Sequence, residues 1–129
     1  MSLHAKGTFD VKAEKVTADS AAFPRFALHK QFRGELEGTS EGEMMTIESP
    51  VKGSGGYVAI EKVAATLAGR KGSFALLHNG TMKHGGNFQL DVKVIPDSGT
   101  DELTGLTGTM KIIIDGKGHS YEFEYSLPN

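Results

Sequence analysis

Short runs of alternating apolar and polar residues, separated by glycine-containing turns, constrain this chain more than any other feature. Apolar side chains occupy every second position over residues 88–94 and again over residues 121–127. A period of two is the pattern of a strand with one buried face. No comparable stretch shows the 3.6-residue spacing of an amphipathic helix. The 17 glycines and only four prolines of the chain suit the turns of successive hairpins. The sequence therefore predicts an all-β protein.

Eight strands are expected along the chain. They span about residues 5–16, 26–36, 41–48, 57–67, 73–82, 86–96, 105–115 and 119–127. Antiparallel strands joined by short hairpins leave two free edges unless the sheet closes on itself. The pattern therefore favours a closed eight-stranded antiparallel barrel, with a two-sheet sandwich as the alternative. One helical turn is expected within residues 96–104, and residues 1–129 are expected to form a single domain.

The alternation also predicts which side chains point inward. Met45 and Ile47 mark the expected inner face of the third strand. A tight turn within residues 115–118 places Ile112 opposite Tyr121, so that apolar partners meet on one face of the last hairpin.

Composition excludes several classes of function. Fourteen basic and 16 acidic residues leave a formal charge of −2, which gives no electrostatic pull toward nucleic acid. The absence of cysteine excludes disulfides, thiolate nucleophiles and cysteine-based metal sites. No apolar run is long enough to span a membrane, and no secretory signal is recognisable, so a cytoplasmic location is expected. His78 and His84 lack the spacing of familiar histidine sites, and no metal or cofactor is expected.

Several segments resemble an uncharacterised bacterial family of unknown function. The resemblance spans about residues 7–125 and is carried by residues 32–40, 57–61, 67–74, 76–81 and 94–108. That family is known for a barrel similar to plant allene oxide cyclase. The resemblance implies an allene oxide cyclase-like, lipocalin-like barrel and implies no activity, because function does not follow from fold. No catalytic residue of the cyclase can be placed on this sequence.

Two polar residues occupy strand positions that the alternation predicts to point inward. Glu61 alternates with Tyr57 on the fourth strand, and His78 lies on the inner face of the fifth. If the turn at residues 69–72 pairs Leu67 with Phe74, Glu61 lies diagonal to His78, within side-chain reach.

A second carboxylate is expected nearby. If Ile47 pairs with Tyr57, Glu43 falls opposite Glu61. Two carboxylates and an imidazole in a partly dry barrel would separate one another's pKa values, as acid–base pairs require. Glu43, Glu61 and His78 are therefore the candidate catalytic residues. The alternative is a solvated or salt-bridged glutamate at the mouth of the barrel.

Three tyrosines also share the inward parity. Tyr57, Tyr121 and Tyr125 are expected to line the cavity, and together with Glu61 and His78 they form the candidate ligand-binding set. Tyrosines on an inner strand face can instead be ordinary core rings with a hydrated hydroxyl.

Three functions follow from this arrangement. The first is a barrel that binds a small, largely apolar ligand with one polar end. The second is a cofactor-free isomerase or cyclase that uses a Glu/His pair within the barrel. The third is a filled barrel that acts as an interaction module, for example in a homo-oligomer. Whether the protein is an enzyme is left open by the sequence.

Overall fold

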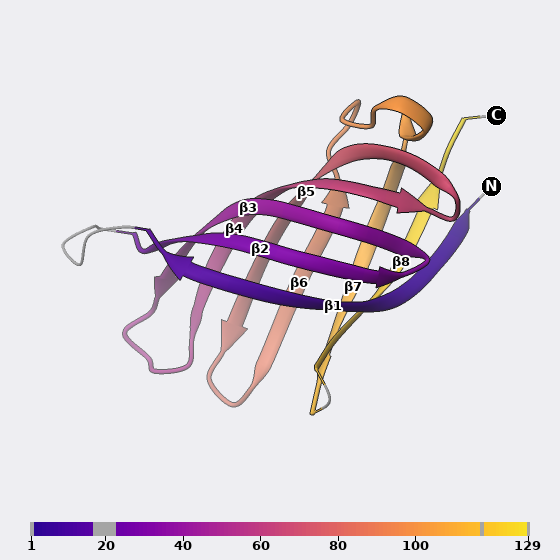
Figure 1. The fold of residues 1–129 in the computed structure, drawn as a ribbon. Coiled ribbons are helices and arrows are strands. Elements are labelled where there is room, and N and C mark those ends of the chain that lie inside the picture. The colour runs from indigo at the N-terminus through magenta and orange to yellow at the C-terminus, as the bar shows by residue number, and fades with distance from the viewer. Residues whose placement is uncertain (1, 17–22, 117, 129) are drawn as a thin grey trace.

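The chain forms a closed barrel of eight antiparallel strands, as the sequence predicts (Figure 1). The computed structural model describes residues 2–16, 23–116 and 118–128. The strands follow one another around the barrel in chain order. They are β1 (Leu3–Lys15), β2 (Arg25–Gly34), β3 (Leu36–Glu48), β4 (Gly55–Leu67), β5 (Arg70–Lys83), β6 (Asn87–Val94), β7 (Thr107–Asp115) and β8 (Gly118–Ser126). Closure pairs β1 with both β2 and β8, which removes the free edges that a sandwich would retain.

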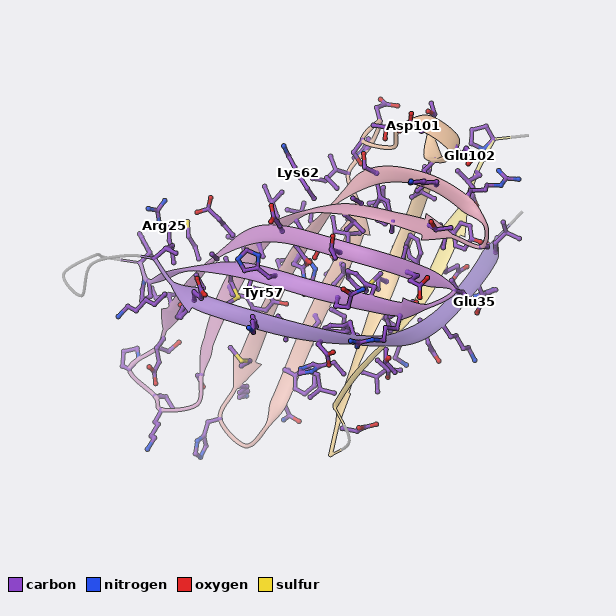
Figure 2. The ribbon with its side chains drawn as sticks, viewed as in Figure 1. Arg25, Glu35, Tyr57, Lys62, Asp101 and Glu102 are labelled. Carbon is purple, nitrogen blue, oxygen red and sulfur yellow. The ribbon has the colours of Figure 1, made fainter. Side chains whose placement is uncertain are left out.

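The two ends of the barrel differ. A 3₁₀ helix, η1 (Asp101–Leu103), lies between β6 and β7 and covers the end where the β2–β3 and β4–β5 turns also lie (Figure 1). Figure 2 shows Asp101 and Glu102 on this helix, with Arg25 at the far end of the barrel. Leu103 and Leu106 are buried and close the capped end with apolar side chains. We call the opposite end, where the β3–β4, β5–β6 and β7–β8 connections lie, the open end.

The core fills the capped half of the barrel. Phe74 stacks on Phe123 at 6.0 Å between ring centroids, and Phe32 meets Tyr121 edge-on at 5.7 Å. The expected pairing of Ile112 with Tyr121 is confirmed, although Lys117 of that turn lies outside the described residues. Large aromatic rings from β2, β5 and β8 thus pack against one another in this half.

The β4–β5 hairpin turns earlier than the sequence predicts. Leu67 pairs with Arg70 rather than with Phe74, so the turn is the dipeptide Ala68-Gly69. Both residues have positive φ, 47° and 87°, which is the requirement of a type I′ turn. The sequence prediction was wrong because glycine, the usual marker of this turn, stands at only one of the two central positions. The shift is even, so every inward side chain keeps its face.

The predicted register between the third and fourth strands was wrong by one residue. An odd error moves each side chain of the strand to the opposite face of the sheet. The β2–β3 turn is centred on Gly34 and Glu35, and β3 begins at Leu36. Ile47 pairs with Gly56, so Met45 and Ile47 point outward and are 40% and 55% exposed. The inner face of β3 carries small residues instead, which leave room for side chains of β4.

The seam between β6 and β7 is the least regular part of the wall. Among the described residues, Lys93 with Thr109 is the one pair that joins these strands, whereas β7 and β8 pair from Thr107–Ser126 to Asp115–Gly118. Toward the open end, the backbones of β6 and β7 therefore lack the regular backbone pairing that joins the other neighbouring strands. Sparse backbone pairing of this kind lowers the free energy of local opening.

Candidate functional site

A buried carboxylate lies near the middle of the barrel. Glu61 points inward from β4 and its side chain is fully buried. Gly42 stands opposite it on β3, and a Cβ atom there would approach Glu61 Cγ to 2.8 Å. The absence of a side chain at Gly42 therefore lets the carboxylate extend across β3 toward β2.

Both carboxylate oxygens have donors. Ser40 Oγ donates to Glu61 Oε1 at 2.8 Å, and Lys30 Nζ donates to Oε2 at 2.9 Å. Lys30 and Ser40 face each other on β2 and β3, and both are buried. The Lys30 ammonium also lies 5.1 Å from the centre of the Phe9 ring. This geometry satisfies a buried charge with a paired cation and a hydroxyl, as burial of a charge requires.

An imidazole completes the group, which we call the Glu61 cluster: Lys30, Ser40, Glu61 and His78. His78 points inward from β5 and its Nε2 contacts Glu61 Oε2. Leu76 faces Glu61 and His78 is the diagonal neighbour, so the expected diagonal contact forms, although from the other side. The Tyr57 ring lies 6.5 Å from the His78 ring, over the space that Gly80 leaves free.

The cluster keeps its carboxylate ionised. Burial by itself would raise the pKa of Glu61, but the hydrogen bond from His78 and the positive charge of Lys30 outweigh it and lower the pKa to about 2. Burial, and secondarily the negative charge of Glu61, raises the pKa of the Tyr57 hydroxyl. At neutral pH the Glu61 carboxylate is therefore ionised, whereas the nearby Tyr57 hydroxyl is protonated.

Apolar side chains lie between the Glu61 cluster and the solvent at the open end. Met82, Phe88 and Ile114 share the inward parity of β5, β6 and β7, yet they are 46%, 53% and 54% exposed. Deeper residues of the same faces, Val92 and Met110, are buried. The inward positions at the open end of β5, β6 and β7 are thus apolar and exposed, and the same side of the wall carries the Glu61 cluster farther inward.

The other residues of the predicted site lie elsewhere. Glu43 faces Ile60 rather than Glu61 and is exposed on the outside of the wall, because the register of β3 differs by one residue from the expected one. Tyr125 stacks on Phe123 at 5.2 Å in the capped half. The structure therefore brings together Glu61, His78 and Tyr57, and keeps Glu43 and Tyr125 apart from them.

Tyr121 is engaged by backbone groups of the β2–β3 turn. Its hydroxyl accepts a hydrogen bond from the Leu36 N–H at 2.9 Å and lies within donating distance of the Arg33 and Leu36 carbonyls, at 3.0 and 2.9 Å. Burial raises the pKa of this hydroxyl. These hydrogen bonds link Tyr121 of β8 to the β2–β3 turn.

Sequence reasoning missed two members of the cluster. Lys30 shares the inward parity of Leu28 and Phe32, and a charged residue in that position of an apolar face was a usable signal. Ser40 had no such signal, because the wrong turn position placed it outside the strands. Correct placement of the turn at Gly34 would have put Ser40 on the inner face.

The part of the chain that the structure describes gives two further observations. It contains no group of three histidine, cysteine, aspartate or glutamate residues arranged to hold a metal ion. None of its helical segments has the length and apolar character needed to cross a membrane.

Comparison with known proteins identifies the family. A family model described as "Protein of unknown function (DUF3224)" matches residues 5–125, and the chain belongs to this family. A crystal structure of a DUF3224 protein of unknown function from Shewanella oneidensis MR-1 is 45% identical, with a TM-score of 0.93 over 100% of this chain and 99% of that chain. Comparison with curated proteins gives no match.

Proposed function

We propose that this DUF3224 protein binds a small, largely apolar molecule with one polar end in the open half of its barrel. The observation that carries the proposal is the division of the inner face into two zones. Exposed apolar side chains at Met82, Phe88 and Ile114 lead inward to the buried Glu61 cluster. Ligand sites typically combine an apolar lining with a few fixed polar groups.

The polar end of the ligand would meet Lys30. An ammonium has three donors, and one of those on Lys30 is directed at Glu61. Lys30 is 8% exposed whereas Glu61 is 0% exposed, so the lysine is the charged member of this pair that retains some access to solvent. An acceptor oxygen on the ligand can therefore bind Lys30 while Glu61 keeps its partners.

The apolar part of the ligand would supply most of the affinity. Each buried methylene contributes about 0.8 kcal/mol, so the nine methylenes of decanol give roughly 7 kcal/mol before the costs of association. Those costs place the expected dissociation constant in the micromolar to millimolar range. The sparse β6–β7 pairing supports entry, because the two strands that carry Phe88 and Ile114 can separate with little loss of backbone bonding.

The isomerase or cyclase alternative ranks below binding. General acid–base catalysis is most effective when the pKa of the group lies near the operating pH. The pKa of Glu61 is lowered to about 2, and its side chain is fully buried. Glu61 in this arrangement is a poor base and holds Lys30 and His78 in position instead.

A thermal-shift experiment with three probes tests the proposal. Decanol, decanoate and decylamine share one chain length and differ in the polar end. A bound probe at 100 times its dissociation constant stabilises the fold by about 2.7 kcal/mol, so the melting temperature should rise by several degrees. At least one probe should produce this rise in the wild-type protein.

Two adjacent positions on β7 provide a matched pair of variants. Ile114 points into the open half, whereas Ile113 points outward. Ile114→Ser should weaken the probe-induced shift and Ile113→Ser should preserve it. A wild-type protein that no probe stabilises, or equal shifts in both variants, would contradict the proposal.

A further inference from the structure

An exposed apolar surface covers the outside of β3, β4 and β5. We call it the β3–β5 patch and define it as Met45, Ile47, Val58, Ile60 and Leu77. Met45 pairs with Val58, and Ile60 pairs with Leu77, so these side chains are direct neighbours across the strands. Met45, Ile47, Val58 and Ile60 are between 40% and 55% exposed.

The composition of this outer face differs from that of the strands across the barrel. The outward positions of β7 and β8 carry Lys111, Glu122 and Glu124, as expected for a sheet face in water. A contiguous apolar area on an outer face indicates an interaction surface. The outside of β3–β5 therefore has the character of a contact surface, in contrast to the charged outside of β7 and β8.

The patch is distinct from the Glu61 cluster, although the two are close. A groove of about 740 Å³ on the outer side of the wall is lined in part by Met45, Ile60 and Lys62. Glu61, between Ile60 and Lys62 in the chain, points the opposite way into the barrel. The backbone of β4 therefore separates the groove from the cluster, and the apolar ligand proposed above does not account for this surface.

Charges of opposite sign border the patch in a regular way. Glu41 on β3 faces Lys62 on β4, and the Glu41 side chain is 81% exposed. Figure 2 shows Lys62 extending away from the outside of the wall. A twofold axis that runs along the strands, between β3 and β4, exchanges the positions of these two strands. It therefore places Glu41 of one copy against Lys62 of the other, and Met45 against Val58.

We propose that the β3–β5 patch docks a second copy of this chain about this twofold axis. Met45 of each copy then meets Val58 of the other, Ile60 lies across from Glu43, and each interface contains two Glu41–Lys62 contacts related by symmetry. Such an isologous interface needs one surface that is complementary to itself, which the charge arrangement provides. Glu41 and Glu43 beside the patch oppose the binding of an anionic lipid surface or a nucleic acid.

The mass of the full chain in solution gives the first test. Light scattering coupled to size-exclusion chromatography should show twice the mass of the 13.8 kDa chain at high micromolar concentration. Val58→Glu should halve this mass, because it places a charge in the centre of the apolar contact. Glu122→Lys, on the outer face of β8, serves as the control and should leave the mass unchanged.

Mixing of two charge variants tests the proposed axis. Glu41→Lys and Lys62→Glu should each form a monomer, because each variant places like charges across the axis. An equimolar mixture should recover the dimer mass, because the two introduced side chains then face each other with opposite charge, and the unchanged Lys62 of the first chain faces the unchanged Glu41 of the second. Contacts within one chain cannot produce this recovery, because neither variant alone contains an opposite-charge pair at these positions.

Three results would overturn the proposal. If the wild-type protein has the mass of one chain at high concentration, the proposed dimer is contradicted. A larger closed assembly would contradict the twofold axis, and a mixture that stays monomeric would contradict the Glu41–Lys62 contact. Circular dichroism of each variant should match the wild-type spectrum, because all the substituted side chains are exposed.

Discussion

Replacement of Glu61 by glutamine tests the Glu61 cluster most sharply. Glutamine keeps nearly the same shape and can still accept a hydrogen bond from Ser40, but it removes the negative charge. Lys30 is 8% exposed and donates to Glu61 at 2.9 Å, so the substitution leaves a buried ammonium without its counter-charge. Removal of one partner from a buried ion pair is strongly destabilising.

The pKa of Glu61 sets the magnitude of this loss. The structure lowers the pKa from 4.5 to about 2, and each unit corresponds to about 1.4 kcal/mol of preference for the ionised form. The shift therefore corresponds to about 3 kcal/mol, at the lower end of the 3–5 kcal/mol typical of a broken buried pair. For a chain of this size, the melting temperature of Glu61→Gln should be about 10 °C lower than that of the wild type.

Urea denaturation of both proteins across a pH series is the appropriate assay. A lowered folded-state pKa contributes stability above the unfolded-state value, and this contribution is lost as the pH falls through the folded-state value. The difference in unfolding free energy should therefore be constant near pH 7 and shrink between about pH 5 and pH 2. A difference below about 1 kcal/mol at pH 7, or one that stays constant down to pH 2, would refute the reasoning.

Three further substitutions have definite expected outcomes in the same assay. Lys30→Met should destabilise the fold, and Lys30→Met combined with Glu61→Gln should cost about 1–3 kcal/mol less than the sum of the two single changes; additivity would contradict the direct pair. Tyr121→Phe should lower the unfolding free energy by about 1–3 kcal/mol, because the buried Leu36 N–H of β3 loses its acceptor. An unchanged urea midpoint would contradict a stabilising role for this hydrogen bond. Gly42→Ala should cost about 1–3 kcal/mol, because the added Cβ would overlap the Ile60 carbonyl oxygen and lie 2.8 Å from Glu61 Cγ. Gly116→Ala, at a position with no atom within 4 Å of the added Cβ, is the matched control.

The barrel was predictable because alternation and turns act locally. The inner faces of β6 and β8 could be identified from period-two spacing, whereas apolar residues on both sides of β4 left its inner face ambiguous, and strand closure followed from the number of hairpins. The proximity of Glu61 and His78 was also predictable, although the expected pairing of Leu67 with Phe74 was wrong. An even error in register leaves each side chain on its original face.

The position of the β2–β3 turn was not predictable from the same signals. Glycines occur at 34, 38 and 42, and only Gly34 belongs to the turn. Gly38 and Gly42 lie within β3, where the positions of a Cβ atom are already occupied by Ala65 and Glu61. A glycine required for space and a glycine required for a turn look the same in a sequence, and this ambiguity misplaced Glu43 and hid Ser40.

Exposure of the apolar outer face added to the error. Met45 and Ile47 were predicted to point inward because large apolar residues are usually buried. Their exposure on the β3–β5 patch reverses that expectation. A departure from the ordinary pattern of a sheet surface is itself a signal of function.

Methyl NMR of the full chain with decanol as the probe tests the central claim most directly. The isoleucine and methionine methyl groups report both faces of the wall, because Ile112, Ile114 and Met82 share the inward parity whereas Ile60 lies outside. We predict saturable shift changes at the inward methyl groups, with the Ile60 signal unchanged. Shift changes at Ile60 alone, or none at the inward methyl groups, would contradict binding inside the barrel.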